Sequence, residues 1–181
     1  MIDRKRLEER PPLATDHLRL RPPTERDADA IIGAVGDWEV ARCLSRVPHP
    51  YHRSDALFFL EHVVPNEWTW AITKIGSDTM IGAVGLTPDD GVETAELGYW
   101  LSKTHWGQGL ATEAARAIAS FGFEQLRLPF IKSGYFASNP ASGRVLRKLG
   151  FVETGHSSRP CHALQKNVLS VEMCLLAEQL R

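Results

Sequence analysis

The feature that most constrains the fold is a strand that runs directly into a glycine-rich turn and a helix. Residues 96–101 read Glu-Leu-Gly-Tyr-Trp-Leu and predict the strand, while residues 106–114 read Trp-Gly-Gln-Gly-Leu-Ala-Thr-Glu-Ala and predict the turn and the helix start. Such a turn exposes backbone N–H groups, and the helix adds the positive end of its dipole. Gly107 and Gly109 carry no Cβ that would keep an anion off the backbone. The stretch therefore predicts a phosphate or diphosphate site, although several classes of nucleotide-binding protein share this pattern.

The rest of the chain predicts a mixed sheet. Before the turn, strands are expected over 68–74, 79–86 and 93–101, joined by short turns. The other expected elements are a strand at 17–21, helices at 24–36, 54–64, 109–125 and 139–149, and strands at 129–136, 151–155 and 169–175. The order β-α-α-β-β-β-α-β-α-β-β describes an α/β protein (an α+β mixed sheet) that is antiparallel in its first half. One crossover should place strands 93–101 and 129–136 in parallel.

Composition sets the class of protein. The 181 residues are 43% hydrophobic and 24% charged, which is ordinary for a globular chain that buries roughly 70% of its extended surface. We expect a charged N-terminal arm over 1–16 and a single domain over 17–181. A net charge of −1 argues against nucleic acid or an anionic membrane as the partner. We expect a cytoplasmic protein that is a monomer or a homodimer.

The cysteines and histidines do not predict a metal site or a disulfide framework. Cys43, Cys161 and Cys174 are widely spaced and odd in number. A zinc site needs four ligands at paired spacings, and the chain has no such set. We therefore expect chemistry without a metal ion.

These features together resemble the GNAT superfamily of N-acetyltransferases, and most closely its branch of ribosomal-protein N-terminal acetyltransferases (the Rim type). The resemblance covers nearly the whole chain and is most specific in segments 96–101, 106–114 and 139–151. The glycine turn of the family reads Gln/Arg-x-x-Gly-x-Gly/Ala, and this chain departs from it by having Trp106 at the first position. The family's fold has a central pair of strands that splay apart.

The resemblance implies that acetyl-CoA is the acetyl donor. Its diphosphate would lie on the backbone N–H groups of Gln108 to Thr112, and its pantetheine arm would pair like an extra strand with Tyr99 to Leu101. Asn139 matches a residue that hydrogen-bonds the pantetheine or adenosine side in relatives. The implied cofactor-binding residues are Tyr99, Trp100, Leu101, Trp106, Gly107, Gln108, Gly109, Leu110, Ala111, Thr112 and Asn139.

Acetyl transfer to an amine needs a neutral amine and a proton for the departing thiolate. Glu96, on the central strand, is interpreted as the general base; the alternative is a structural glutamate satisfied by backbone donors. Ser142, in the first turn of the last helix, is interpreted as the acid; the alternative is a serine that caps its own helix. Many relatives carry a tyrosine in that helix where this chain has Leu146, which donates no proton. Tyr99 and Tyr135 offer other hydroxyl groups.

The nature of the amine decides how much help the nucleophile needs. An α-amine with a pKa of ~7.8 is roughly 14% neutral at pH 7, whereas a lysine amine at ~10.4 is roughly 0.04% neutral. We therefore expect an N-acetyltransferase that acts on a peptide or protein N-terminal α-amine. Two alternatives stay open: acetylation of a small-molecule amine (amino acid, polyamine or antibiotic), and a non-catalytic acyl-CoA-binding module. The loops 37–53 and 157–167 are expected to shape the acceptor site.

Overall fold

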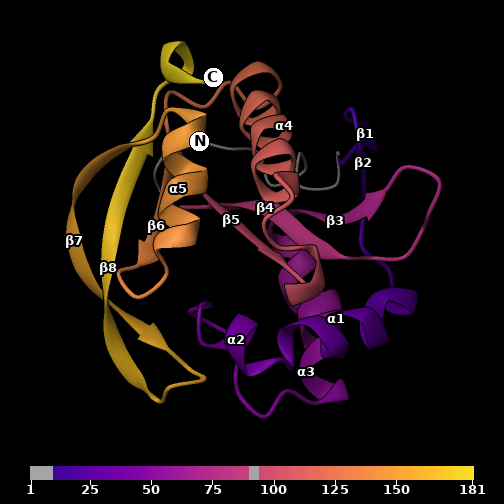
Figure 1. Ribbon diagram of the computed structural model, residues 1–181. Helices are drawn as coiled ribbons and strands as arrows, with labels where there is room; N and C mark the ends of the chain where they lie inside the picture. Colours follow the sequence, from indigo (N-terminus) through magenta and orange to yellow (C-terminus); the bar gives the residue numbers. More distant parts are fainter. Residues whose placement is uncertain (1–9, 90–93) are drawn as a thin grey trace.

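The computed structural model describes residues 10–89 and 94–181, and a single mixed sheet runs through it (Figure 1). Its eight strands follow the order β1-β2-β3-β4-β5-β6-β8-β7. The strands are β1 (Leu13–Ala14), β2 (Leu18–Arg21), β3 (Trp68–Lys74), β4 (Gly82–Pro88), β5 (Ala95–Leu101), β6 (Ile131–Phe136), β7 (Val152–Cys161) and β8 (Lys166–Leu175). Among these, β5 and β6 are parallel and all other neighbours are antiparallel. The predicted mixed sheet is confirmed.

Helices cover both faces of this sheet. The helices are α1 (Ala28–Val35), α2 (Trp38–Ala41), α3 (Arg53–Phe58), α4 (Leu110–Glu124) and α5 (Pro140–Leu149). Helices α4 and α5 lie together on one face, and α1 to α3 lie on the other (Figure 1). Side chains alternate along β5, so that Leu97 and Tyr99 pack in the α4/α5 core while Trp100 packs against the α1–α3 core.

Strands β5 and β6 pair over a short length and then separate. Their Cα partners are Ala95 with Ile131 and Glu96 with Lys132. Beyond Glu96, no strand of the described residues pairs with this edge of β5. The Ser133 hydroxyl donates a hydrogen bond of 2.9 Å to the Leu97 carbonyl there. The predicted splay of the central strand pair is confirmed, and it leaves a gap through the middle of the sheet.

The C-terminal hairpin corrects one prediction. Segment 157–167, expected to be an irregular loop, instead belongs largely to β7 and β8. The two strands pair from Val152 with Cys174 to Cys161 with Lys166, next to the short turn that joins them. Most of β7 is exposed or half-exposed on both faces. Because neither face is buried, its sequence lacks the apolar alternation by which strands are recognised.

The helical region before β3 also differs from the expectation. Segment 37–53 contains the short helix α2. The helix expected over 54–64 begins after His52 and passes from α3 into a π-helical turn at Phe59–Val63 and a 3₁₀ turn at Val64–Asn66. Pro65 has no N–H for the carbonyl four residues earlier, so the regular helical ladder cannot continue there.

The described part of the N-terminal arm packs on the domain. Residues 1–9 of the predicted arm lie outside the described residues. The Arg10 guanidinium donates to the Val64 carbonyl at 2.6 Å, and the Trp70 indole N–H donates to the Pro11 carbonyl at 3.0 Å. Over residues 10–89 and 94–181, no helix has the length and apolar character needed to cross a membrane.

Candidate active site

The glycine turn has the geometry of an anion cradle. Gly107 and Gly109 have φ angles of +74° and +81°, a conformation that L-residues with side chains rarely adopt. Apart from the adjoining backbone, a Cβ added at either glycine would meet no described atom within 4 Å, so this backbone faces open space. Gly109 caps α4, and the N–H groups of residues 110–112 have no acceptor inside the helix. This turn therefore presents free N–H groups and the positive end of a helix of 15 residues.

A cavity of about 930 Å³ extends into the gap between β5 and β6. Residues of this turn, of the two strands and of α2, α3 and α5 line it. All but one of the predicted cofactor-binding residues line it, namely Tyr99, Trp100, Leu101, Trp106, Gly107, Gly109, Leu110, Ala111, Thr112 and Asn139. Glu96 and Ser142 line it as well. The exception is Gln108, whose side-chain amide donates to the Thr104 carbonyl at 3.1 Å. The cavity thus joins the anion cradle to the open edge of β5, and the placement of an acetyl donor in it stays a prediction.

The edge of β5 that borders the gap offers backbone groups to such a ligand. The Leu97 carbonyl accepts from Ser133, and the Leu101 carbonyl accepts from the Trp106 indole N–H at 2.9 Å. Residues of one strand alternate in the direction of their backbone groups. Tyr99, which lies between these two, therefore directs its N–H and its carbonyl into the gap. Pairing of the pantetheine arm with this edge stays a prediction.

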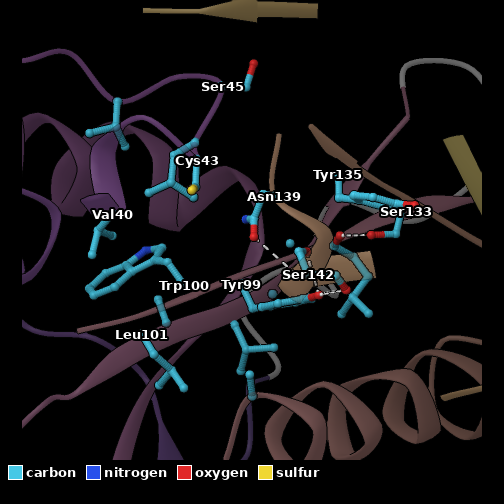
Figure 2. A pocket seen from close by; sticks show the side chains of 18 of the residues that line it. Val40, Cys43, Ser45, Tyr99, Trp100, Leu101, Ser133, Tyr135, Asn139 and Ser142 are labelled. Carbon is cyan, nitrogen blue, oxygen red and sulfur yellow. Dashed lines mark hydrogen bonds between the residues drawn. The ribbon is translucent and has the colours of Figure 1, made fainter. Parts of the chain in front are cut away.

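Ser142 and Tyr99 form a hydrogen-bonded pair on the α4/α5 face of the sheet. The two hydroxyl oxygens are 2.8 Å apart, and the Tyr99 hydroxyl also donates to the Ser142 carbonyl at 3.2 Å (Figure 2). Burial raises the pKa of Tyr99, so the phenol stays protonated at neutral pH. The Asn139 side chain caps α5, accepting from the Ser142 N–H at 3.3 Å. Leu146 is fully buried, and the Tyr135 hydroxyl, which also lines the cavity, accepts from Arg147 at 2.6 Å.

Glu96 lies on the opposite face and has a cationic partner. Its Oε1 accepts from Arg159 Nη1 at 2.6 Å, and 35% of its side chain is exposed. Arg159 is also bound to Glu172 through two of its nitrogens, with Nε donating to Oε1 at 2.8 Å. The Ser157 hydroxyl donates to the same carboxylate at 2.6 Å. The partner of Glu96 is thus the arginine of a distant strand, whereas the structural alternative invoked backbone donors.

Sequence reasoning missed Arg159 because it stands in the segment expected to be a loop. No local motif marks it. Had 152–161 been recognised as a strand, Ser157 and Arg159 would have been placed on one face of it. The hydrogen bonds of both side chains to Glu172 show that this face also carries the carboxylate of β8.

The two segments expected to shape the acceptor site meet in the structure. The Ser45 hydroxyl donates to the Pro160 carbonyl at 2.8 Å, and the His162 N–H donates to the Ser45 carbonyl at 3.1 Å. These contacts join the loop after α2 to the far end of the β7–β8 hairpin, as the ribbon shows (Figure 1). The cavity wall at this end includes Cys43, Arg46, Phe58, Phe59, Glu67 and His162. Burial raises the pKa of the Cys43 thiol, which makes it a poor nucleophile.

Within the described residues, no three side chains of His, Cys, Asp or Glu are grouped to hold a metal ion. Chemistry without a metal stays a prediction.

Comparisons with known proteins agree with this geometry. Residues 17–152 match the family described as "Acetyltransferase (GNAT) domain". The chain is 30% identical over 158 residues to the uncharacterized N-acetyltransferase YoaA of Bacillus subtilis (strain 168), covering 80% of this chain and 85% of that protein. The ribosomal-protein-S5-alanine acetyltransferase of Vibrio fischeri has a similar fold, with a TM-score of 0.76 at 18% identity over 94% of this chain and 99% of that one. So does Mycobacterium smegmatis RimJ in complex with CoA-disulfide, with a TM-score of 0.75 at 20% identity over 90% of this chain and 83% of that one.

The chain belongs to the GNAT family of N-acetyltransferases. It is an acetyltransferase, and its similar proteins include ribosomal-protein acetyltransferases. Enzymes of this family use acetyl-CoA as the acetyl donor.

Proposed function

We propose that this enzyme transfers the acetyl group of acetyl-CoA to the α-amine of a peptide or protein N-terminus. The observation that carries the proposal is the cavity through the β5–β6 gap. It has an anion cradle at residues 107–112 and the Glu96–Arg159 pair at the strand junction. A donor held on the α4/α5 side and an acceptor held on the α1–α3 side would meet inside the gap.

On the donor side, the proposed contacts follow from the free groups of the chain. The N–H groups of residues 110–112 would bind the diphosphate, because a helix start favours negative charge. The Tyr99 N–H and carbonyl would pair with the amide groups of the pantetheine arm. The thioester sulfur would then lie near the Ser142–Tyr99 hydroxyl pair, which lines the same cavity.

The proposed chemistry forms one bond and breaks one. The amine nitrogen bonds to the thioester carbonyl carbon, and the bond from that carbon to sulfur breaks. The amine gives up a proton to Glu96, directly or through water, and the thiolate takes a proton from the Ser142 hydroxyl. Glu96 and Ser142 return to their starting states by exchange with water. The products are an N-acetyl amine and free CoA.

An α-amine suits this site better than a lysine amine. Roughly 14% of an α-amine with a pKa of ~7.8 is already neutral at pH 7, so a single carboxylate suffices as the base. Glu96 keeps one carboxylate oxygen for this task, because Arg159 occupies the other. The similar fold of a ribosomal-protein-S5-alanine acetyltransferase supports an N-terminal acceptor.

The test is a thiol-release assay with acetyl-CoA against short peptides with free N-termini, free amino acids, polyamines and aminoglycosides. We expect the highest kcat/KM for a peptide. A higher value for a small amine would replace the proposal with small-molecule acetylation. Binding of acetyl-CoA with no thiol release from any amine would support a module that only binds acyl-CoA.

A further inference from the structure

The guanidinium of Arg159 has more donors than its observed partners use. An arginine carries five N–H groups, and three of those on Arg159 are accounted for. Nε and Nη2 donate to Glu172, and Nη1 donates to Glu96. One N–H on Nη1 and one on Nη2 therefore have no partner within residues 10–89 and 94–181. Because Arg159 lines the cavity and its side chain is 28% exposed, these donors are accessible to a ligand.

Glu96 is the complementary half of this arrangement. Its Oε1 is held by Arg159, while its Oε2 has no partner among the described residues. An acceptor oxygen and donor N–H groups are thus fixed side by side on the acceptor face of the sheet, joined by a contact of 2.6 Å. A ligand that matches them needs an amine next to a hydrogen-bond acceptor.

We infer that Arg159 binds the first carbonyl oxygen of the acceptor while Glu96 binds its amine, so that the pair selects α-aminoacyl acceptors. This inference rests on the proposed function and specifies the acceptor class. In an α-aminoacyl group the nitrogen and the carbonyl oxygen are separated by two carbons and lie about 3 Å apart when they point the same way. A lysine side chain, a polyamine or an alkylamine offers no carbonyl at that position.

The anchoring of Arg159 makes it a fixed recognition element. Its two bonds to Glu172 form the bidentate geometry that a planar guanidinium favours. Those bonds raise the pKa of Arg159 further, so the group stays cationic throughout the working pH range. Glu172 is held in turn by Ser157. The first carbonyl oxygen of the acceptor would therefore bind a guanidinium that is already held in place and needs little reorganisation.

The test couples a change in the enzyme to a change in the acceptor. One acceptor is alanine N-propylamide, and the other is a 2-aminoalkane of the same length that lacks the carbonyl. The kcat/KM of each is measured with the wild type, Arg159→Gln and Arg159→Lys. The alkylamine is also measured as a competitive inhibitor of the amide reaction, which gives its affinity when it reacts slowly.

We expect Arg159→Gln to lower kcat/KM for the amide by about 10- to 100-fold, the effect of losing a charged hydrogen bond. Its effect on the alkylamine, as substrate or inhibitor, should stay under about threefold. Arg159→Lys should restore part of the amide activity, because it keeps the charge. Equal losses for both acceptors would overturn the inference and reduce Arg159 to a support for Glu96.

Arg46→Gln is the matched control. Arg46 lines the same cavity and pairs with Glu67 at 2.8 Å, so its replacement also removes a guanidinium from a glutamate. We expect it to change both acceptors by the same factor. An amide-selective loss as large as that of Arg159→Gln would contradict the assignment. If the wild-type enzyme acetylates neither of the two compounds nor any peptide, the proposed function itself is wrong. That outcome is separate from the inference on Arg159, because it is seen with the wild type alone.

Discussion

At the scale of single residues, the four groups that the proposal uses, which all line the cavity, form two hydrogen-bonded pairs on opposite faces of the sheet. Ser142 and Tyr99 face α4 and α5, and Glu96 and Arg159 face α1 to α3. The alternation of side chains along β5 puts Glu96 on one face and Tyr99 on the other. The gap between β5 and β6 is what allows both pairs to border one cavity.

The Ser142 pair should act on the leaving group and leave donor binding intact. We expect Ser142→Ala to lower kcat by about 100-fold, the low end for a general acid, because a thiolate leaves fairly well unaided. Tyr99→Phe, which removes only the neighbouring hydroxyl, should cause a smaller loss. Calorimetry should give an almost unchanged Kd for acetyl-CoA in both variants. A kcat loss under about threefold in both would mean that water supplies the proton.

The Glu96 carboxylate should matter more for a strongly basic amine. We expect Glu96→Gln to lose most of kcat with every acceptor, and to lose more with a lysine-like amine, of which only roughly 0.04% is neutral at pH 7. The measurement is kcat for the variant and the wild type with one peptide α-amine and one lysine side chain. Equal losses on the two amines would argue that Glu96 orients the acceptor and does not act as a base.

Residue identities predicted this site only in part. Glu96 and Ser142 were chosen from their places on a strand and in a helix, Asn139 was chosen from the family resemblance, and all three line the cavity. Arg159 was not found, because its contact with Glu96 depends on strand pairing that a polar, exposed strand does not reveal in its sequence. Pairs that join distant segments are set by tertiary packing, and local pattern carries little information about them.

At the scale of the elements, the glycine turn and the start of α4 form one functional unit. Gly109 needs a positive φ, and its open side faces the cavity. Gly76, in the turn between β3 and β4, has nearly the same φ of +83° and equally open surroundings, but it does not line the cavity. Substitutions at Gly76 and Gly109 should therefore cause similar backbone strain, but only a side chain at Gly109 would enter the cavity and exclude a ligand.

A valine at each of these glycines should give different results. Both variants should be destabilised by about 1–2 kcal/mol, since a side chain is disfavoured at positive φ. Only Gly109→Val should also lose acetyl-CoA affinity, by about tenfold or more, because its side chain would occupy the cradle. Calorimetry with acetyl-CoA on the folded variants decides this. Equal affinities in Gly109→Val and Gly76→Val would contradict the placement of the diphosphate.

The start of the α1 region is tied to β2 by a buried ion pair. Asp27 is 3% exposed. It accepts two hydrogen bonds from Arg21, at 2.7 and 2.8 Å, and one from the Thr24 N–H at 2.8 Å. Burial alone would raise the pKa of Asp27, but these hydrogen bonds lower it overall. These bonds anchor the first helical segment to the sheet.

Removing this charge should destabilise the protein in a pH-dependent way. We expect Asp27→Asn to cost about 3 kcal/mol at pH 7, because it leaves Arg21 without its buried partner. A lowered carboxyl pKa stabilises the fold above the unfolded-state value of about 3.9, and this is lost as the pH falls through the folded-state value. Urea unfolding at pH 7 and near pH 3 should show that the difference in the free energy of unfolding between variant and wild type becomes smaller in acid. A difference in the free energy of unfolding that is absent at pH 7, or that does not change with pH, would contradict this account.

At the scale of the whole molecule, the sheet is continuous where β5 and β6 pair at Ala95 and Glu96, and it is open beyond that point because the two strands separate. The order of the main elements, the antiparallel first half and the single parallel crossover followed from hydrophobic periodicity and turn residues, and all are confirmed, whereas β1 and α2 are additional elements that were not predicted. The length of β7 and the π-helical turn after α3 were not predicted. β7 is an exposed edge strand, where burial gives no clear periodic signal, and Pro65 marks the end of the regular helix without specifying the kind of turn before it.

The central claim is acetyl transfer to an N-terminal α-amine, and one peptide tests it most directly. A short peptide with a free N-terminus and one internal lysine is incubated with acetyl-CoA and the wild-type enzyme at pH 7. Fragmentation mass spectrometry then locates the acetyl group, with Glu96→Gln as the control for uncatalysed transfer. We predict that the acetyl group is on the α-nitrogen of the first residue. Acetylation of the lysine side chain instead, or an unmodified peptide under conditions where a small amine is acetylated, would contradict the account.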